Sequence, residues 1–493
     1  MGSDPIYLDY AATTPVDPAV AAEMSACLTT SGDFGNASSA THVFGHRAAA
    51  RVATARAQIA ALIGADPDEI TFTSGATESN NLTILGLARS NADRGRHIIT
   101  TRIEHKAVLD PCKRLEREGF AVTYLTPDRQ GLVDVAAVQA ALRPDTILVS
   151  VMFVNNEIGV LQDVGAIGAL CRERGIAFHT DAAQAVGKIP IDVRTLPVDF
   201  LSLTAHKIYG PKGAGALYVR RASRPLLKPL FFGGGQERGL RPGTLATHQI
   251  VGLGAACELA TRLVRSDQER LTALRERLWE GLAPLGGVHL NAAGAPRVPG
   301  ILNVSFEGVE GESLVTSLAG LALSTGSACN SASDEPSYVL RALGRDTQLA
   351  QSSLRFSVGR FTTAADVEFA IETVCREVTR LRELSPASES PGGAPSVASG
   401  EAGGPGQETW VRFHLAVAND IVKAARFKAY GCPHTVEVAQ WLTDRLPGRR
   451  RDEGVPGNPA EWAQTLGVPV DRLGRLLVVE DALLACFARW PTA

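Results

Sequence analysis

The chain has 493 residues, of which 45% are hydrophobic and 20% are charged, and its formal net charge is −3. This length is too great for one compact core, so two or three domains are expected. The near balance of charge argues against a protein that binds nucleic acid or a membrane surface.

No apolar run reaches the roughly 18 residues that a membrane helix needs, and the first residues show no secretory signal. Eight cysteines are scattered along the chain without a CxxC pair or a close His/Cys cluster. This pattern argues against a structural zinc site or a disulfide framework, and it is typical of a reducing cytoplasm. Most of the cysteines lie in apolar, helix-like contexts typical of core residues, but Cys329 and Cys432 do not.

Predicted strands and helices alternate through the first half of the chain. Two helical segments, 17–30 and 42–63, come first. Strands are then predicted at 69–73, 97–100, 121–125, 146–151, 176–180 and 198–203, and helices at 80–90, 106–118, 136–142 and 164–174. Repeated strand–helix units of this kind predict an α/β fold with a mainly parallel sheet covered by helices on both faces.

The first of these strands runs into the small, polar residues 74–79, and the next helix follows directly. Free backbone N–H groups and the positive dipole end at a helix N-terminus make a phosphate site. An ordinary Ser/Thr helix cap is the alternative. The pattern has neither the GxGxxG nor the Walker spacing, so a nucleotide is not indicated.

Polar residues stand where several predicted strands end. Asp181 follows 176–180, and Lys207 lies just past 198–203. Ligands collect at this edge of open α/β sheets. A lysine for a Schiff base and a carboxylate for a pyridine nitrogen suit pyridoxal phosphate (PLP). A strand-end acid plus a surface lysine is the alternative, but His105 and Asn156, which follow two further strands, favour a functional site.

The second half of the chain begins with a Gly-rich segment, 231–244, predicted as a long loop. Two long helical segments over 245–285 would bridge to a second domain. That domain is predicted to contain strands at 300–306 and 353–357 and helices at 311–318 and 364–381.

The segment 324–333 is small and polar throughout and contains Cys329. With no apolar neighbours to bury it, this thiol is predicted to be exposed on a mobile loop, as a reactive cysteine requires. A loop cysteine without a role is the alternative. Arg355, in the strand 353–357, has a planar fork suited to a substrate carboxylate, with a surface ion pair as the alternative.

Residues 385–407 are almost wholly Ser, Pro, Gly and Ala, which predicts a flexible linker. Beyond it, 408–493 has its own apolar runs and is predicted to be a separate C-terminal module.

Residues 1–384 resemble the cysteine desulfurases, in the group that includes IscS and NifS. The motifs that carry the resemblance are YLDYAATTPVDP (7–18), TSGATESNN (73–81), EHKAVLD (104–110), NNEIGVLQD (155–163), DAAQAVGK (181–188), HKIYGPKGAGALYVR (206–220), STGSACNSAS (324–333) and SSLRFSVGRFTT (352–363). The cysteine segment has the long-loop form of this group.

The resemblance implies a PLP-dependent transferase of fold type I. A large domain, roughly 15–262, would hold a mainly parallel seven-stranded sheet, and 1–14 with 263–384 would form a smaller α+β domain. It also implies a cytoplasmic homodimer that converts L-cysteine to L-alanine and passes sulfur to acceptors such as an iron–sulfur scaffold. An aminotransferase or a selenocysteine lyase on the same scaffold is the alternative, and the loop cysteine argues against transamination.

By position, the resemblance assigns roles to individual residues. Lys207 would bind PLP as a Schiff base, Asp181 would pair with the pyridine nitrogen, and Gln184 would pair with the ring hydroxyl. His105 would stack on the ring and help to move protons. The phosphate would be held by Ala76, Thr77, Thr204 and His206, with Thr244 contributed by the partner subunit.

Asn156 and Arg355 would orient the substrate carboxylate, and Cys329 would attack the substrate sulfur and leave as a persulfide. No firm metal site is predicted, although Cys329 could share a cluster with a scaffold partner.

The C-terminal module resembles IscU-type iron–sulfur scaffolds. Residues 425–432 match the second-cysteine segment, and 478–485 match the closing helix. The scaffold's final His-Cys pair aligns with Gly474-Arg475, however, and its first cysteine segment has no counterpart. Since a cluster needs several ligands, the module is predicted to hold none unaided. A protein-interaction or regulatory role is favoured, with Cys432 either a vestige or a sulfur acceptor.

Overall fold

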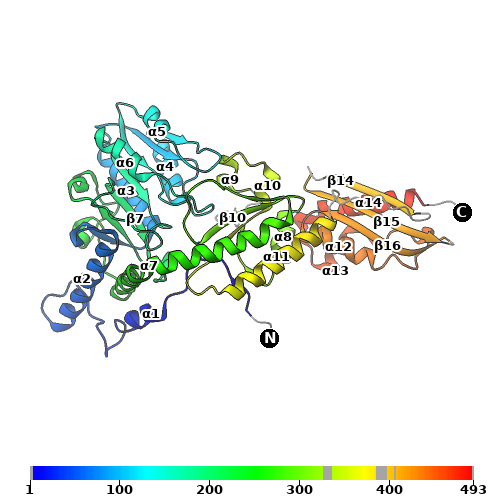
Figure 1. The fold of residues 1–493 in the computed structure, drawn as a ribbon, viewed down its shortest axis with the longest axis horizontal. Coiled ribbons are helices and arrows are strands. Elements are labelled where there is room, and N and C mark those ends of the chain that lie inside the picture. The colour runs from blue at the N-terminus through cyan, green and yellow to red at the C-terminus, as the bar shows by residue number, and fades with distance from the viewer. Residues whose placement is uncertain (1–3, 326–335, 385–396, 405–406, 419, 491–493) are drawn as a thin grey trace.

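The computed structural model describes residues 4–325, 336–384, 397–404, 407–418 and 420–490. Its large domain is built on a seven-stranded sheet (Figure 1). The strand order is β2-β8-β7-β6-β5-β3-β4, and only β8 runs against its neighbours. The strands are β2 (Ile70–Thr73), β3 (His97–Thr101), β4 (Ala121–Leu125), β5 (Thr146–Ser150), β6 (Ala177–Asp181), β7 (Phe200–Thr204) and β8 (Gly215–Val219).

Helices cover both faces of this sheet, which is why its central strands are buried along their whole length. On one face, Leu82, Ile84 and Val108 of α3 (Ala76–Ser90) and α4 (Lys106–Arg117) pack into one apolar core. The other face packs against α2 (Val43–Ile63), α6 (Val164–Glu173) and the first half of α7. The short helices α1 (Pro18–Ser25) and α5 (Val135–Ala141) complete the domain.

Helix α7 (Thr247–Leu282) joins the large domain to the small one (Figure 1). The prediction of two helices here is wrong, because α7 is continuous over 36 residues. The polar stretch 265–270 in its middle contains neither proline nor glycine. It therefore interrupts the apolar pattern without breaking the backbone.

The small domain contains an antiparallel sheet of order β12-β13-β10-β9. Its strands are β9 (Val288–Leu290), β10 (Ile301–Phe306), β12 (Ser324–Thr325) and β13 (Ser353–Ser357). A separate pair joins β1 (Ile6–Tyr7) to β11 (Leu321–Ala322). The helices are α8 (Gly311–Ser317), α9 (Tyr338–Ala342), α10 (Thr347–Gln351) and α11 (Ala364–Leu384).

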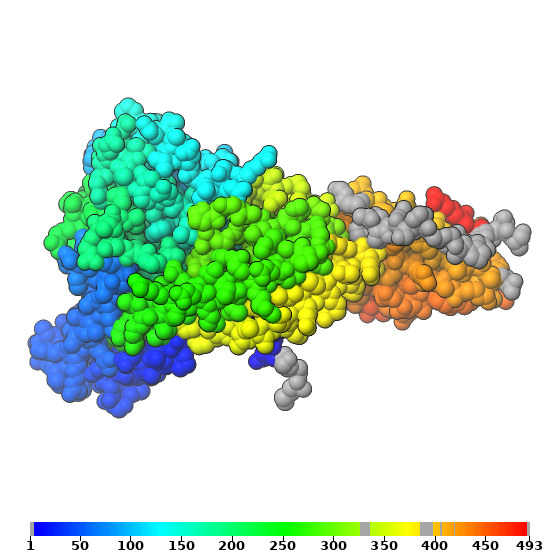
Figure 2. All heavy atoms as spheres, in the orientation of Figure 1, coloured from blue at the N-terminus to red at the C-terminus, as the bar shows by residue number. Residues whose placement is uncertain are grey.

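The C-terminal residues form a module at the end of the long axis (Figures 1 and 2). Its antiparallel sheet has the order β14-β15-β16, formed by β14 (Val397–Gly404), β15 (Thr409–Ala418) and β16 (Ile421–Tyr430). Helices α12 (Pro433–Thr443), α13 (Pro459–Leu466) and α14 (Leu473–Ala488) accompany it. Its apolar core is drawn wholly from residues 398–490.

The prediction of a flexible linker is wrong for 397–404, which form β14 paired with β15. The other parts of 385–407 lie outside the described residues, except for Gln407. The small residues of β14 have a packing role. A Cβ at Gly400 would lie 2.2 Å from the backbone nitrogen of Cys486, so α14 approaches the strand too closely for a side chain.

The module contacts the small domain through α8 and α10. Ser313 Oγ donates to the carbonyl of Gly431 at 2.6 Å, and Gln348 Nε2 donates to the Tyr430 hydroxyl at 2.9 Å. Across the whole described chain, no helix is both long and apolar enough to cross a membrane.

Candidate active site

Polar side chains gather at the carboxyl ends of the strands in the large sheet. Asp181 ends β6, Thr204 ends β7, and Lys207 closes the turn that follows β7. His105 precedes α4 after β3, and Asn156 follows β5. Because β2, β3, β5, β6 and β7 run in the same direction, these side chains share one edge, as the sequence predicted.

A cavity of about 570 Å³ opens at this edge. All of the predicted cofactor and substrate residues except Thr244 line it: Ala76, Thr77, His105, Asn156, Asp181, Gln184, Thr204, His206, Lys207 and Arg355. Thr244 is exposed on the loop after η4 (Glu237–Gly239) and is absent from the lining. Cys329 lies outside the described residues.

The carboxylate of Asp181 is held from two sides. Its Oδ2 accepts a hydrogen bond from Asn80 Nδ2 at 2.7 Å, and its Oδ1 accepts from the Ala183 backbone at 2.9 Å. Beneath it, His179 is bonded on both ring nitrogens, to the hydroxyls of Ser150 and Ser202. Burial lowers the pKa of His179 to about 4, so this imidazole is neutral at pH 7.

Two histidines in the cavity are also neutral near pH 7. His105 Nδ1 accepts from the Ala107 backbone at 3.0 Å, which assigns the ring proton to Nε2. Burial lowers the pKa of His105, and the charge of Lys207 adds to this effect. Burial, together with the charges of Lys207, Lys212 and Lys188, lowers the pKa of His206 to about 4.

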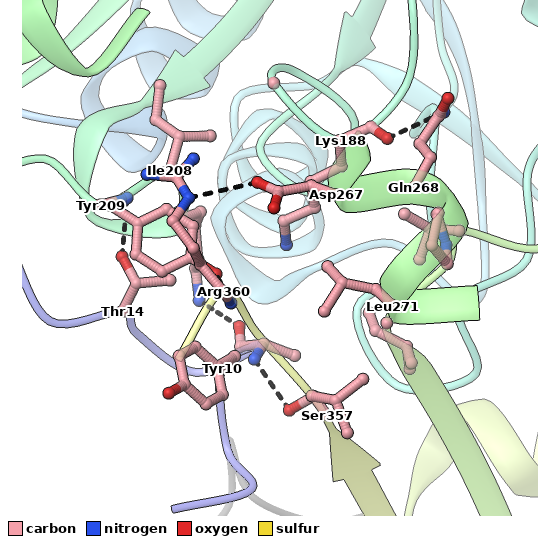
Figure 3. A pocket seen from close by; sticks show the side chains of 18 of the residues that line it. Tyr10, Thr14, Lys188, Ile208, Tyr209, Asp267, Gln268, Leu271, Ser357 and Arg360 are labelled. Atoms are coloured by element: carbon pink, nitrogen blue, oxygen red, sulfur yellow. Dashed lines mark hydrogen bonds and ion pairs between the residues drawn. The ribbon is translucent and has the colours of Figure 1, made fainter. Parts of the chain in front are cut away.

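The amine of Lys207 donates to the carbonyls of Ala11 and Ala12, each at 2.5 Å. Gln184 bonds the same Ala11 carbonyl through Nε2 and accepts from Lys188 Nζ through Oε1. Lys188 and Lys207 both line a second cavity of about 40 Å³, which Figure 3 shows beside the Asp267–Arg360 ion pair. Burial and the nearby charges of Lys207 and Arg355 lower the pKa of Lys188 to about 7.

The N-terminus of α3 supplies backbone donors to the large cavity. The helix begins at Ala76 after Gly75, which caps it without a side-chain bond and has φ of 153°, a conformation that favours glycine. The first N–H groups of a helix have no partner within it. With the hydroxyl of Thr204 close to Gly75, they form a cradle of donors suited to a phosphate.

Arg355, in β13 of the small domain, contacts Asn156, which follows β5 of the large sheet, and both residues line the cavity. The Arg355 guanidinium is buried, pairs with Asp9 Oδ1 at 2.7 Å and donates to the Asn156 carbonyl at 2.9 Å. Among the described residues, Arg355 Nε and Asn156 Oδ1 are buried without a hydrogen-bond partner. Such atoms are costly unless a ligand bonds them.

Comparisons with known proteins agree with this geometry. The model of the aminotransferase class-V family matches residues 6–369. The cysteine desulfurase IscS of Pectobacterium atrosepticum is 59% identical over 382 residues, which cover 78% of this chain and 95% of that protein. The chain belongs to the cysteine desulfurases of this family.

Solved structures in this family share the fold. A structure titled NifS-like protein aligns with a TM-score of 0.71 and 36% identity, covering 76% of this chain and all of that one. SspA in complex with cysteine aligns with a TM-score of 0.66 and 42% identity, covering 73% of this chain and all of that one. The predicted family and the PLP-dependent α/β fold of the desulfurase part are thereby confirmed.

The large cavity fits PLP, the cofactor of cysteine desulfurases. A lysine, a carboxylate, a neutral histidine and a helix N-terminus stand around one space, and this donor set is complementary to the aldehyde, ring nitrogen, ring face and phosphate. Of the described residues, no group of three or more His, Cys, Asp or Glu is placed to hold a metal ion.

Sequence reasoning missed several supporting residues. Asp9 lies in the YLDYAATTPVDP motif, and Glu104 and Glu157 each stand beside a predicted site residue. Burial raises the pKa of Glu104 to about 8 and that of Glu157 to about 7. Glu104 and Glu157 lie in motifs that carry the family resemblance, which could have drawn attention to them, but the burial of an acid is visible only in the folded chain.

Proposed function

We propose that this desulfurase converts L-cysteine to L-alanine and transfers the sulfur to Cys329 as a persulfide. The observation that carries the proposal is the single cavity shared by Lys207, Asp181, His105 and Arg355. The sequence-level match to cysteine desulfurases supports the same reaction.

Each functional group of the chain has its own role in the proposed reaction. Bound PLP supplies an electron-accepting ring. Lys207 Nζ holds the cofactor, and Asp181, fixed by Asn80, favours the charged ring nitrogen. His105 Nε2 carries a proton that it can share with the reacting groups. Arg355 and Asn156 orient the substrate carboxylate.

The sulfur step balances without an external oxidant. The Cys329 thiolate bonds to the substrate sulfur as the carbon–sulfur bond breaks, and a proton passes to the substrate carbon to give alanine. A persulfide is left on Cys329, and an acceptor or a reductant must remove it before the next turnover. Cys329 lies outside the described residues, and the mobile loop that the sequence predicts for it would suit both transfers.

The test is to incubate the PLP-loaded protein with L-cysteine and a thiol reductant, and to measure sulfide and alanine. The wild type should produce both in equal amounts. Lys207→Ala should lose both products together with the absorbance of the lysine-bound cofactor. An active Lys207→Ala variant would contradict the proposal.

A homodimer in the cytoplasm is also proposed. The loop that holds Thr244 also exposes Phe231 and Phe232, by 44% and 88%. Exposed neighbouring aromatics are typical of a partner surface. The seven described cysteines are all unpaired, which suits a reducing compartment. Light scattering at micromolar concentration should give twice the chain mass for the wild type and a smaller mass for Phe232→Asp.

For the C-terminal module we propose a scaffold-like interaction domain that holds no cluster. Cys432 is buried at the start of α12, and its thiol lies 3.4 Å from the Thr435 hydroxyl. Arg475, at the position of a scaffold ligand, interacts with the same thiol. A guanidinium cannot ligate iron, so its presence beside Cys432 argues against a cluster. Purified module-containing protein that bound iron and sulfide stoichiometrically would overturn this.

A further inference from the structure

Two buried serines border the segment that contains Cys329. Ser324 precedes it in β12, and Ser337 follows it at the start of α9. Each hydroxyl donates to a carboxylate: Ser324 to Asp9 Oδ1 at 2.9 Å and Ser337 to Glu157 Oε2 at 2.5 Å. The two sides of the segment are therefore fixed by the same kind of hydrogen bond.

Both carboxylates lie beside the residues proposed to hold the substrate carboxylate, Arg355 and Asn156. Asp9 Oδ1 also pairs with Arg355 Nη2, and this nitrogen donates to Ser324 Oγ at 3.0 Å. Ser324 and Arg355 are directly opposed in the β12–β13 register. Glu157 is the neighbour of Asn156, whose carbonyl accepts from Arg355 Nη1.

A third hydrogen bond joins the residues after the Cys329 segment to the residue that precedes His105. The hydroxyl of Tyr338, next to Ser337, donates to the carbonyl of Glu104 at 2.7 Å. Glu104 precedes His105, and its own carboxyl accepts from the Met152 backbone at 2.7 Å. The residues that follow the Cys329 segment are thus hydrogen-bonded to the chain neighbours of two site residues, Asn156 and His105.

We propose that Glu157 and Ser337 are positioning residues for sulfur transfer, which fix where the Cys329 segment rejoins the fold relative to Arg355 and Asn156. This inference rests on the proposed function. Its physical basis is that a reacting group displaced by about 1 Å can lose up to about a hundredfold in rate. Substrate binding needs only Arg355, Asn156 and the cofactor, so it should not depend on this bond.

A carboxylate is a costly choice for a bond that serves stability alone. Glu157 is almost fully buried, at 4% exposure, and burial raises its pKa to about 7 although the Ser337 hydroxyl and the charge of Arg355 oppose this. A neutral acceptor would avoid that desolvation. At this position the acid accepts the hydrogen bond of Ser337, just after the Cys329 segment, and also interacts with the charge of Arg355.

The test uses the PLP-loaded full chain with Ser337→Ala, Ser337→Thr and Glu157→Met, which removes the acceptor. Cysteine binding is followed by the change in cofactor absorbance, and sulfur transfer by alanine formed in a single turnover without reductant. Ser337→Ala should slow alanine formation by about tenfold while cysteine affinity changes less than about twofold. Ser337→Thr, which keeps the hydroxyl, should recover most of the rate.

Ser223→Ala is the matched control. Ser223 is also buried and donates to a carboxylate, Asp199 Oδ1 at 2.5 Å, but it lies at the opposite edge of the large sheet. Its alanine rate should equal that of the wild type. Ser337→Ala combined with Glu157→Met should lose no more rate than the worse single variant, since the first change removes the donor and the second the acceptor of the same bond.

Equal rates in Ser337→Ala and Ser223→Ala would overturn the inference, as would a loss of cysteine affinity as large as the loss of rate. If Ser337→Ala does not fold, Glu157→Met decides by the same comparison. A wild type that binds cysteine but forms no alanine would instead contradict the proposed function itself.

Discussion

Asn80 of α3 donates a hydrogen bond to Asp181 at the end of β6, across 2.7 Å and 101 positions in the chain. The helix whose N-terminus is proposed to bind the cofactor phosphate therefore also holds the carboxylate that is proposed to pair with the ring nitrogen. One helix would therefore act on both ends of the cofactor.

Asn80→Ala should weaken PLP binding, because it leaves Asp181 less well oriented. A hydrogen bond to a charged group contributes about 1.5–3 kcal/mol, which corresponds to at least about tenfold in affinity. Dialysis against PLP-free buffer, followed by absorbance, measures the retained cofactor. Asn81→Ala is the control, since the partly exposed Asn81 side chain donates to the Thr77 carbonyl of its own helix. Equal retention in the two variants would refute the role of Asn80.

Stability should fall as the solution is acidified, in part because of His179. Burial lowers its folded-state pKa to about 4, below the usual value of 6.5, so the unfolded state takes up a proton first. The contribution is present above pH 6.5 and is lost as pH falls from 6.5 to 4. At pH 5 the loss is about 2 kcal/mol relative to pH 7. Urea unfolding at both pH values should show a smaller difference in His179→Gln, and an unchanged difference would contradict this.

Gly400→Val should destabilise the C-terminal module, because its Cβ would collide with the α14 backbone. Overpacking of this kind costs about 1–3 kcal/mol or more. Four of the five tryptophans lie in the module, at 410, 441, 462 and 490, so tryptophan fluorescence reports its unfolding. Gly404→Val, in the same strand with open space around it, is the control. Matching unfolding midpoints would disprove the close approach.

Arg475→Ala should expose the Cys432 thiol. Cys432 has no exposed surface in the folded chain, and Arg475, which interacts with its thiol, also pairs with Glu312 and Glu408. Removing this side chain should speed labelling by a thiol reagent at least about tenfold, as expected when access controls reactivity. Labelling is located by mass spectrometry, with Arg489→Ala, on the exposed end of α14, for comparison. Equal labelling rates of Cys432 in the wild type and in Arg475→Ala would contradict a thiol that Arg475 shields.

The large domain was predictable because its strands are short apolar runs that end in polar residues, as at Asp181 and Lys207. Periodicity alone could not reveal that α7 is continuous, since residues 265–270 interrupt its apolar face. Composition also misled at β14, where glycine reflects a close helix approach that depends on residues more than eighty positions away. The buried acids Glu104 and Glu157 escaped notice because charge in a sequence suggests surface.

The most direct test measures whether the substrate sulfur is transferred to the enzyme. The PLP-loaded protein is mixed with L-cysteine without reductant, and alanine is counted while the peptides are examined by mass spectrometry. One additional sulfur atom on the peptide that contains Cys329, matched by one alanine per active site, is predicted. Alanine formed at the wild-type rate by Cys329→Ala, or no sulfur on that peptide, would contradict it.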